Sequence, residues 1–415
     1  MSASPARQGP GQPGQPGQPG VEPLRSIHVG VGTRGASHLR AALGSGYWRP
    51  AALVDVVPEY LAAARELTGL PESACYTRLE GALEAVPSDA VVVASPVTLH
   101  AAQILSGLGA GRHVLTEKCF TVGLADAVAC VEAAERHGRR LMVVQNARLS
   151  PPMRTLRRLI AEGTYGPLGL FTQTFFKARG GPYNLSPHMH LWQQGVHELD
   201  TLLAVLQRPV RRVWGLSTSP AWCDWPTPST VQAVLECEGG LSGTHLSTSN
   251  ARAGGFEMRL ECAAAALVAR DRTWGPIEVH WGPGGRRSET LPPDAPDTRG
   301  LEQHPAAKEV LADPQAAGRG LGRLIDMVIY RDFFEYVCAG REPESSGRRN
   351  LQTVRLLDAI QRSSEAGRPV EMEAQPASEQ REQREQREQR EQREQREQRE
   401  QREQREQREQ REQRE

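Results

Sequence analysis

The sequence predicts an α/β doubly wound parallel sheet, followed by an α+β domain with a mostly antiparallel, open-faced sheet. Two observations lead to this fold class. Up to about residue 147, apolar runs alternate with helix-compatible segments, which is typical of a parallel sheet. From residue 148, short β-like runs follow one another with turns between them, which is typical of antiparallel strands. We therefore expect domains at 25–147 and 148–372, with tails at 1–24 and 373–415.

The first domain is expected to contain five strands, at 27–29, 51–54, 89–94, 113–116 and 141–144. The third of these runs reads Asp-Ala-Val-Val-Val-Ala and has no polar face, as in a parallel strand that is buried on both sides. One helix is expected directly after the first strand, and others at 58–68, 79–86, 99–108 and 124–137. Gly69 and Gly138 follow two of these segments and are typical helix stops.

The second domain is expected to begin with a joining helix at 152–161. Its β-like runs lie at 168–177, 210–218, 230–238, 241–249, 256–261 and 277–281. Further helices are predicted at 197–206, 323–339 and 350–366, and a long Gly/Pro/Arg-rich surface loop at 282–320. Since these few helices cannot cover both faces of the sheet, an uncovered apolar face predicts a homodimer or homotetramer.

Composition argues against several classes of protein. The 415-residue chain has a formal net charge of zero, so the charge balance favours neither nucleic acid nor a membrane surface as a partner. No apolar run approaches the ~20 residues of a membrane span, and residues 1–24 lack the apolar core of an export signal. The seven cysteines are scattered and form no Cys-x-x-Cys pair, which favours reduced thiols in a cytoplasm.

Both tails are low in complexity. Residues 1–20 carry Gly-Gln-Pro repeats, and residues 379–415 repeat Glu-Gln-Arg without an apolar residue. Because neither segment can bury a core, the first is predicted to be disordered and the second to be a solvated helix or disordered.

A glycine-rich turn after the first strand is the strongest motif. It lies between an apolar run and a helix-compatible segment, and a second apolar run then ends in Asp55. This is the context of a dinucleotide-binding Rossmann fold, in which the glycines permit a tight turn, approach of the pyrophosphate and close helix packing. Asp55 is placed to accept hydrogen bonds from a ribose diol. The predicted cofactor-binding residues of the turn are Gly30, Gly32, Thr33, Arg34 and Gly35.

Asp55 also bears on the choice of cofactor. It is followed by Val56 and Val57, so no Arg or Ser is available for a 2′-phosphate, which the carboxylate would repel. We therefore expect NAD(H) rather than NADP(H).

The carboxyl ends of the predicted strands place a second group of residues near the same site, because ligands of doubly wound sheets bind beyond these ends. Lys118 is notable in this group, since only three of the 50 basic residues are lysines and a lysine, unlike an arginine, can be tuned toward neutrality. The group comprises Ser95, Pro96, Glu117, Lys118, Gln145 and Asn146.

Several segments together carry a family resemblance. They are 30–35 with Asp55, 93–96 with His100, 111–118, 145–148 with Pro151, 195–200 and 365–370. In order and spacing the chain resembles, over residues 26 to 372, the family of glucose–fructose oxidoreductase, inositol 2-dehydrogenase and the rhizopine catabolism protein (Gfo/Idh/MocA). The resemblance implies a Rossmann domain, an open-faced sheet used for oligomerisation, and NAD(P)-dependent oxidation or reduction of sugars, polyols or related compounds.

The resemblance also implies roles for single residues. Lys118 matches the lysine of the family's Glu-Lys-Pro motif, which can hydrogen-bond the reacting hydroxyl and stabilise a developing alkoxide. His197 matches the histidine of Gly-x-His-x-x-Asp, which serves as acid/base beside the substrate. Further cofactor contacts are expected from Ser95, Pro96, His100, Glu117, Asn146 and Arg148.

Structural interpretations stay open beside these roles. Lys118 is otherwise an ordinary surface lysine, His197 a histidine satisfied by the backbone at a helix N-terminus, and Arg148 half of an interdomain salt bridge. Candidate substrate contacts are Lys177, Gln193, Gln194 and Asp200.

Two positions depart from the family pattern. Cys119 replaces the proline of Glu-Lys-Pro, which leaves open whether the preceding peptide bond is cis, as often in the family, or trans. Gln193 stands where many oxidising members have an Asp, and it cannot share a proton with His197. A second hypothesis follows, in which the protein binds the cofactor but acts as a sensor or partner-binding protein. Retention of both Lys118 and His197 argues against it.

A metal site is not expected. His188, His190 and His197 lack the i, i+4 spacing of helical zinc ligands and a nearby carboxylate pair, so we expect them to line a polar pocket. The sequence thus predicts an NAD(P)-dependent dehydrogenase or reductase that acts on CH–OH groups of a small-molecule substrate.

Overall fold

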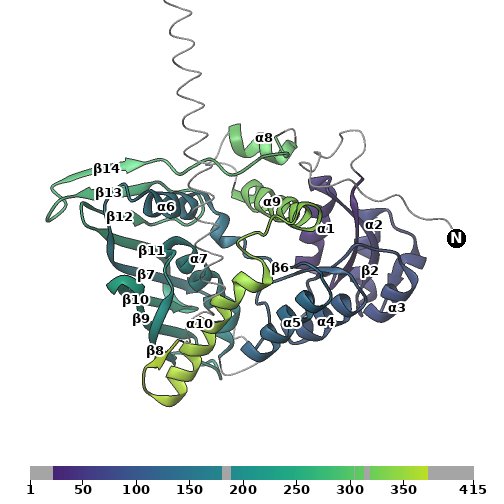
Figure 1. Ribbon diagram of the computed structural model, residues 1–415, viewed down its shortest axis with the longest axis horizontal. Coiled ribbons are helices and arrows are strands. Elements are labelled where there is room, and N and C mark those ends of the chain that lie inside the picture. Colours follow the sequence, from purple (N-terminus) through teal and green to yellow (C-terminus); the bar gives the residue numbers. More distant parts are fainter. Residues whose placement is uncertain (1–21, 180–187, 303, 313–317, 373–415) are drawn as a thin grey trace, which may run out of the picture. The chain divides into compact units, whose positions relative to one another are not determined.

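The computed structural model describes residues 22–179, 188–302, 304–312 and 318–372 (Figure 1). The predicted C-terminal tail and residues 1–21 of the predicted N-terminal tail lie outside the described residues. Leu24, the last residue assigned to that tail, instead opens the first strand.

The first sheet has six strands in the order β3-β2-β1-β4-β5-β6, and every neighbouring pair is parallel. This is the strand order of a doubly wound dinucleotide-binding fold, so the predicted fold class of the first half is confirmed. Strand β3 is not predicted, because two residues are too few to show a periodic pattern. The strands are β1 (Leu24–Val29), β2 (Trp48–Val54), β3 (Cys75–Tyr76), β4 (Ala90–Val93), β5 (His113–Thr116) and β6 (Leu141–Val143).

Five helices accompany these strands, and each corresponds to a predicted helix. Helix α2 ends at Gly69, which has a φ of 70° and donates its backbone N–H to Arg65 O, as expected of a glycine stop. The helices are α1 (Thr33–Ser45), α2 (Pro58–Thr68), α3 (Leu79–Ala85), α4 (His100–Gly109) and α5 (Leu124–Arg136).

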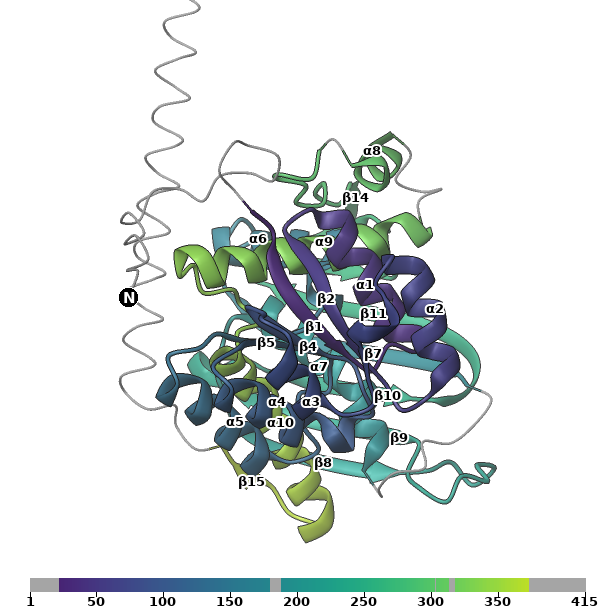
Figure 2. The same cartoon turned by 90° about the vertical axis from the view of Figure 1, so that its right-hand side faces the viewer.

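Helices lie on both faces of the parallel sheet (Figure 2). Alternate residues of its strands pack into two different cores. Val91 and Val93 of β4 belong to the core that contains the buried side chains of α4 and α5. Ala90 and Val92 belong to a second core, formed with α1 and with α9 (Gly318–Ala339) from the far end of the chain. The run at 89–94 is therefore buried on both faces, as its lack of polar residues predicts.

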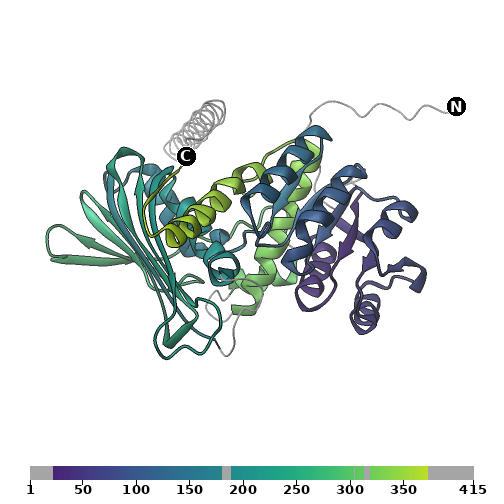
Figure 3. The same ribbon diagram turned by 90° about the horizontal axis from the view of Figure 1, so that it is seen from below.

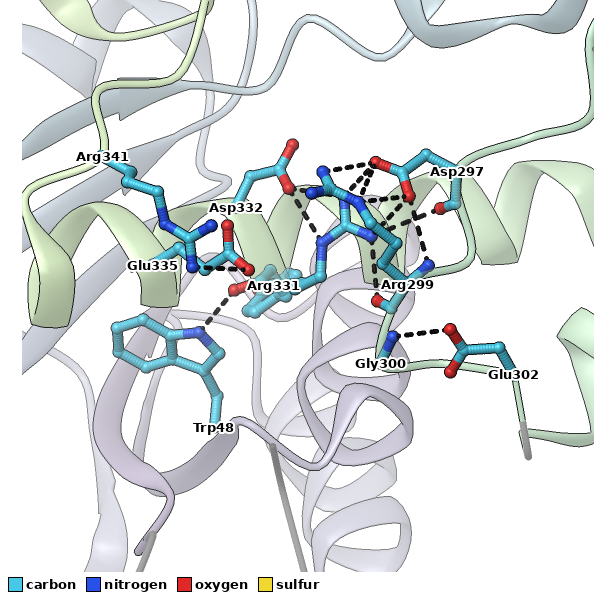
Figure 4. A network of polar contacts seen from close by, with 10 residues as sticks. Trp48, Asp297, Arg299, Gly300, Glu302, Arg331, Asp332, Glu335 and Arg341 are labelled. Carbon is cyan, nitrogen blue, oxygen red and sulfur yellow. Dashed lines mark hydrogen bonds and ion pairs between the residues drawn. The ribbon is translucent and has the colours of Figure 1, made fainter. Parts of the chain in front are cut away.

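Polar contacts add to the apolar packing that holds α9 on the first domain (Figure 4). The indole N–H of Trp48 donates to a main-chain carbonyl of α9 at 2.8 Å, and its ring stacks on Phe333 with centroids 4.9 Å apart. Arg331 of α9 is buried and forms ion pairs with Asp297 at 2.9 Å and Asp332 at 2.7 Å. The pair with Asp297 ties α9 to the segment that precedes it.

The second sheet has nine strands in the order β14-β13-β12-β11-β7-β10-β9-β8-β15. Its neighbours are antiparallel except β10 and β7, which are parallel, so the predicted mostly antiparallel sheet is confirmed. The strands are β7 (Leu168–Ala178), β8 (Val210–Thr218), β9 (Thr230–Cys237), β10 (Ser242–Thr248), β11 (Asn250–Cys262), β12 (Ala265–Ala269), β13 (Ile277–Trp281), β14 (Arg287–Leu291) and β15 (Val370–Glu371).

The prediction of a long surface loop at 282–320 is wrong. This segment contains β14 and α8 (Pro305–Ala312), and α9 begins within it. Strand β14 reads Arg-Ser-Glu-Thr-Leu and joins the sheet at its edge beside β13, so its polar residues carry no strand signal. Strand β12 is also not predicted, because an Ala-rich run has little strand preference and pairing with β11 and β13 decides its conformation.

The second sheet has one covered and one open face (Figure 3). Helix α10 (Gly347–Ala366) packs so closely on β8 that a Cβ at Gly215 would lie 2.6 Å from Ile360 O. Helices α6 (Pro151–Glu162) and α7 (Val196–Leu206) are the other long helices of this domain before α8. Large apolar side chains are exposed on strands β7, β8 and β9, namely Leu170, Trp214, Leu216 and Val234.

Candidate active site

The glycine-rich turn between β1 and α1 brings backbone atoms close together. Gly30 has a φ of 77°, and a Cβ there would lie 2.5 Å from Ser95 N. A Cβ on Gly35 would lie 1.9 Å from Gly30 O, so α1 can lie against the turn only because residue 35 is glycine. A Cβ on Gly32 would first meet the movable ring of Tyr60, at 3.1 Å. Packing therefore explains Gly30 and Gly35, whereas Gly32 leaves the approach to the N-terminus of α1 open to a phosphate.

Asp55 follows β2 and is oriented by the same turn. Its carboxylate accepts hydrogen bonds from the N–H of Val31 at 2.8 Å and the N–H of Val57 at 3.0 Å. Asp55 is half-buried, and a carboxylate has lone pairs beyond these two, so it can accept further bonds from a diol. Thr33 is exposed at the start of α1.

Arg34 is bound by other protein groups. Its guanidinium donates to Glu117 at 2.5 Å and to the two carboxylate oxygens of Asp326 in α9, at 2.7 and 3.0 Å. Asp326 lies 292 residues further along the chain, so only the fold brings this pair together. The sequence predicts a cofactor contact for Arg34; the structure shows an anchor between β5, α1 and α9.

Glu117 is buried at the end of β5 and accepts hydrogen bonds from three groups. These are the guanidinium of Arg34, His38 Nε2 at 2.9 Å and the backbone N–H of Lys118 at 3.0 Å. Burial raises the pKa of Glu117, but the hydrogen bond from His38 and the charge of Arg34 outweigh it and hold the pKa well below its ordinary value. The ionised Glu117 can only accept hydrogen bonds, so His38 Nε2 carries a proton, and the Tyr330 hydroxyl lies 3.2 Å from His38 Nδ1.

Lys118 leaves the carboxyl end of β5 and reaches the second domain. The peptide bond between Lys118 and Cys119 is cis, the alternative that the family pattern favours. Lys118 Nζ donates to Gln193 O at 2.9 Å. Gln193 lies in a π-helical turn (η4, Leu191–Gly195), and such turns are frequent at functional sites. This turn leads directly into α7, which carries His197 at its second position.

His197 is half-buried, and its environment favours the neutral imidazole. Burial lowers its pKa well below the ordinary value, and the positive charge of Lys118 lowers it further, against a smaller opposing effect of Glu117. Its Nδ1 is buried and has no hydrogen-bond partner among the described residues. A neutral ring with an unpaired nitrogen is suited to accept a proton.

Lys177, at the end of β7, is bonded to the same stretch. Its Nζ donates to Gln194 Oε1 at 2.9 Å and to Glu198 Oε1 at 2.7 Å. Burial lowers the pKa of Lys177 and raises that of Glu198, although each charge opposes the shift of the other. Lys177 is thus not a solvated lysine at a strand end. The sequence does not single out Glu198, because only the packing of α7 against β7 gives it a cationic partner.

His100 is not placed for a cofactor contact. Its ring is 1% exposed, and its two nitrogens lie 2.9 Å from Ser95 O and 2.9 Å from Cys119 O. We correct the predicted role accordingly, since the ring joins the loop after β4 to the loop that carries Lys118. Ser95 donates its hydroxyl to Gln103 at 2.6 Å, and Pro96 is exposed beside it at the carboxyl edge of the sheet.

Arg148 and Asp200 form a buried ion pair. The Arg148 guanidinium donates to both carboxylate oxygens, with Nε at 2.7 Å from Oδ2, and Nη1 donates to a backbone carbonyl at 3.0 Å. Asp200 also accepts from Asn350 at 3.3 Å and Thr353 at 2.9 Å in α10. These contacts correct the predicted cofactor role of Arg148 and the predicted substrate role of Asp200, because both groups are buried and committed to each other. A structural salt bridge is the interpretation that the geometry supports, although by the predicted boundary both residues belong to the second domain.

Gln145 and Asn146 follow β6 at the carboxyl edge of the parallel sheet. Gln145 is 1% exposed, and neither atom of its amide has a partner in the part of the chain that the structure describes. An unpaired buried amide costs about 1–3 kcal/mol, so this group is available to a ligand. The position of Gln145 after a strand predicts its place at this edge, but no motif in the sequence marks it as a cofactor contact. Asn146 is half-buried beside it.

No group of three metal-binding side chains occurs among the described residues. His190 does not line a pocket, because its buried ring contacts Ser247 at 3.3 Å and Ser249 at 3.1 Å. All seven cysteines have free thiols. Within the ranges described, no helix has the length and apolar character needed to cross a membrane.

Three features of this site are typical of NAD-binding oxidoreductases. They are a glycine-rich turn that is open to a phosphate, an oriented acid, and a lysine and a histidine near the carboxyl edge of a parallel sheet. Comparison with known proteins agrees with this class. Residues 24–145 match the model of the oxidoreductase family with an NAD-binding Rossmann fold, and residues 153–268 match that of the GFO/IDH/MocA C-terminal domain. The chain belongs to the Gfo/Idh/MocA family.

Relatives and solved structures extend over most of the described chain. D-apiose dehydrogenase of Paraburkholderia graminis is 26% identical over 85% of this chain and 91% of its own. Inositol 2-dehydrogenase of Rhizobium meliloti is 26% identical over 62% of this chain and 79% of its own. A crystal structure of an oxidoreductase from Agrobacterium radiobacter in complex with NAD+, L-tartaric acid and magnesium has the same fold. It superposes with a TM-score of 0.68 at 18% identity, covering 84% of this chain and 98% of that one.

Proposed function

We propose that this protein is an NAD-dependent oxidoreductase that moves a hydride between nicotinamide and a carbinol or keto carbon of a sugar-like or polyol substrate. The proposal is carried by one observation: Lys118 donates a hydrogen bond to the π-helical turn η4, which leads into the helix that carries His197, and the charge of Lys118 lowers the pKa of His197. The names of the two relatives, a dehydrogenase of D-apiose and one of inositol, support this substrate class.

The residues present fit NAD(H). Gly30 and Gly35 have no room for a Cβ, so the turn packs tightly and the N-terminus of α1 is available to the phosphates. Asp55 can accept hydrogen bonds from a ribose diol. The unpaired amide of Gln145 offers a donor and an acceptor at the edge where the nicotinamide end is expected. When bound, the cofactor supplies the hydride acceptor or donor.

Lys118 and His197 have different roles at the reacting oxygen. The Lys118 ammonium is a compact donor that can bond this oxygen and stabilise its developing negative charge. His197 is neutral, so it can take the hydroxyl proton during oxidation and return it during reduction. Lys118 bonds the main-chain carbonyl of residue 193, so the presence of Gln instead of Asp there leaves this contact in place.

The open face of the second sheet supports further proposals about assembly and location. Its exposed Trp214, Leu216 and Val234 make a homodimer or homotetramer through this face the expected state. The free thiols of all seven cysteines support a cytoplasmic location.

We place the boundary between the two domains at residues 147 and 148, between β6 and α6.

The test is turnover. Purified protein is incubated with NADH and a panel of keto-sugars, and with NAD+ and the corresponding polyols, while the absorbance of NADH is followed. We expect turnover that is lost in His197→Ala with unchanged NADH affinity. A protein that binds NADH but never consumes it with any of these compounds would instead be a sensor.

A further inference from the structure

Two cations lie over the ring of Phe175. Lys177 Nζ lies 4.0 Å from the ring centroid, and Arg272 Cζ lies 4.5 Å from it. Phe175 and Lys177 belong to β7, whereas Arg272 belongs to the loop between β12 and β13. The shared ring makes these three side chains one group, which we name the cationic cluster (Phe175, Lys177 and Arg272).

The two cations of the cationic cluster differ in their partners. Lys177 donates to Glu198 and is therefore partly neutralised. Arg272 is half-buried, yet it makes no hydrogen bond or ion pair within the described ranges. Arg270, two residues earlier, is more exposed and is paired with two glutamates. Since a half-buried guanidinium normally finds an anionic partner, Arg272 is the group whose partner must come from outside this part of the chain.

The charge of the cationic cluster reaches the proposed catalytic base. After burial and Lys118, Arg272 and Lys177 are further causes of the lowered pKa of His197. Three cations, Lys118, Arg272 and Lys177, act on His197 against one carboxylate, Glu117, which is already paired with Arg34. Of the three cations, Lys177 is itself paired with Glu198. The surroundings of His197 therefore have an excess of positive charge.

We propose that Arg272, together with Lys177, binds a carboxylate of the substrate, which makes the substrate a sugar acid, that is, a polyhydroxylated carboxylate. The planar fork of a guanidinium matches a carboxylate, and the ring of Phe175 keeps its plane in place. Glu198 Oε2 is buried without a partner among the described residues, so it accepts a bond from a substrate hydroxyl. This inference rests on the proposed function, because Lys118 and His197 receive the reacting hydroxyl.

The experiment compares acids with neutral compounds of the same shape. Binding of gluconate, galactonate and glucuronate, against glucitol, galactitol and glucose, is measured by calorimetry with saturating NADH, and KM and kcat are measured with NAD+. The variants are Arg272→Gln and the matched control Arg270→Gln. We expect at least one acid to bind at least about 10-fold more tightly than its neutral counterpart. Arg272→Gln should weaken binding of that acid by about 10- to 100-fold and change binding of the neutral counterpart far less.

The outcomes separate this inference from the proposed function. Equal binding of acids and neutral counterparts, or equal weakening of both by Arg272→Gln, would overturn the carboxylate site even if sugars are turned over. Acid binding that depends on Arg272 without turnover of any probe would support the carboxylate site and contradict the proposed reaction. Loss of acid binding in Arg270→Gln to the same degree would also overturn it, since a general surface charge would then explain the preference.

Discussion

Two carboxylates on the two sides of the site, Glu117 and Glu198, satisfy their hydrogen bonds differently. Glu117 accepts from Arg34, His38 and a backbone N–H, and its pKa is lowered because these contacts outweigh burial. Glu198 is bonded to Lys177 through one oxygen, its other oxygen has no partner in the described part of the chain, and burial raises its pKa.

The difference separates what the protein completes by itself from what it leaves to a ligand. The groups that hold Lys118 are satisfied internally, so their geometry exists before any ligand arrives. On the side of the proposed substrate, Glu198 has an acceptor oxygen without a partner and Arg272 has N–H donors without a partner among the described residues, so a ligand would supply both partners. We therefore expect mutations near Glu117 to change turnover and stability, and mutations near Glu198 to change substrate specificity.

The largest effect is expected at Lys118. Both Lys118→Ala and Lys118→Arg should lower kcat by ~10²–10³, because a guanidinium keeps the charge but is too broad to act as one compact donor. NADH affinity should change far less, since the phosphates and the ribose are expected to bind at the glycine-rich turn and Asp55. The control is Lys308→Arg, at an exposed lysine, which should be silent. Wild-type turnover in Lys118→Arg would remove this residue from the mechanism.

The next effect is on stability, at Glu117. Glu117→Gln removes the charged acceptor that Arg34 and His38 share, and should lower the free energy of unfolding by about 2–3 kcal/mol because two charge-assisted hydrogen bonds are lost. The exposed pair of Arg212 and Glu236 gives the control, because Glu236→Gln should cost less than about 1 kcal/mol. Urea unfolding measures both variants.

The stability effect at Glu117 should depend on pH. Because the pKa of Glu117 is lowered in the folded state, its contribution is fully present above the unfolded pKa of about 4.3 and is lost as the pH falls further. The difference in stability between wild type and Glu117→Gln should therefore shrink in acid. A difference that stays constant down to pH 3 would contradict the assignment of a buried carboxylate.

A smaller effect concerns the acid limb of kcat/KM. Because burial and the neighbouring cations lower the pKa of His197, this limb should fall well below pH 6.5. Removing the positive charge in Arg272→Gln makes the imidazolium less unfavourable, so the limb should move to higher pH, by less than about one unit. The profile is measured with a neutral substrate. A limb that moves to lower pH would contradict the proximity of Arg272 and His197.

The smallest effect on stability is expected at Gly32. Gly32→Ala meets only a movable ring, so the free energy of unfolding should change by less than about 1 kcal/mol, while NADH affinity falls because the methyl group stands in the approach to α1. Gly109→Ala, where a Cβ has open space, is the control and should leave affinity unchanged. Unaltered NADH binding in Gly32→Ala would place the pyrophosphate elsewhere.

Local features can be predicted from the sequence alone. The turn at 30–35, the strand that ends at Asp55 and the apolar run at 90–94 are each encoded within a few residues, by backbone freedom and by periodicity. The helices of the first domain follow for the same reason. Lys118 and His197 come from short motifs that resemble a family, so they too can be named before the fold is known.

Which of these residues come into contact depends on the tertiary structure. Asp326 of α9 reaches Arg34, and Asp200 of α7 reaches Arg148, so two predicted ligand contacts are internal ion pairs. Arg272 lies in a loop beside a strand that the sequence does not predict, and it reaches Phe175 through the order of strands β12, β11 and β7. Such pairs join residues far apart in the chain, and their contact depends on how complete layers pack, which no local pattern records.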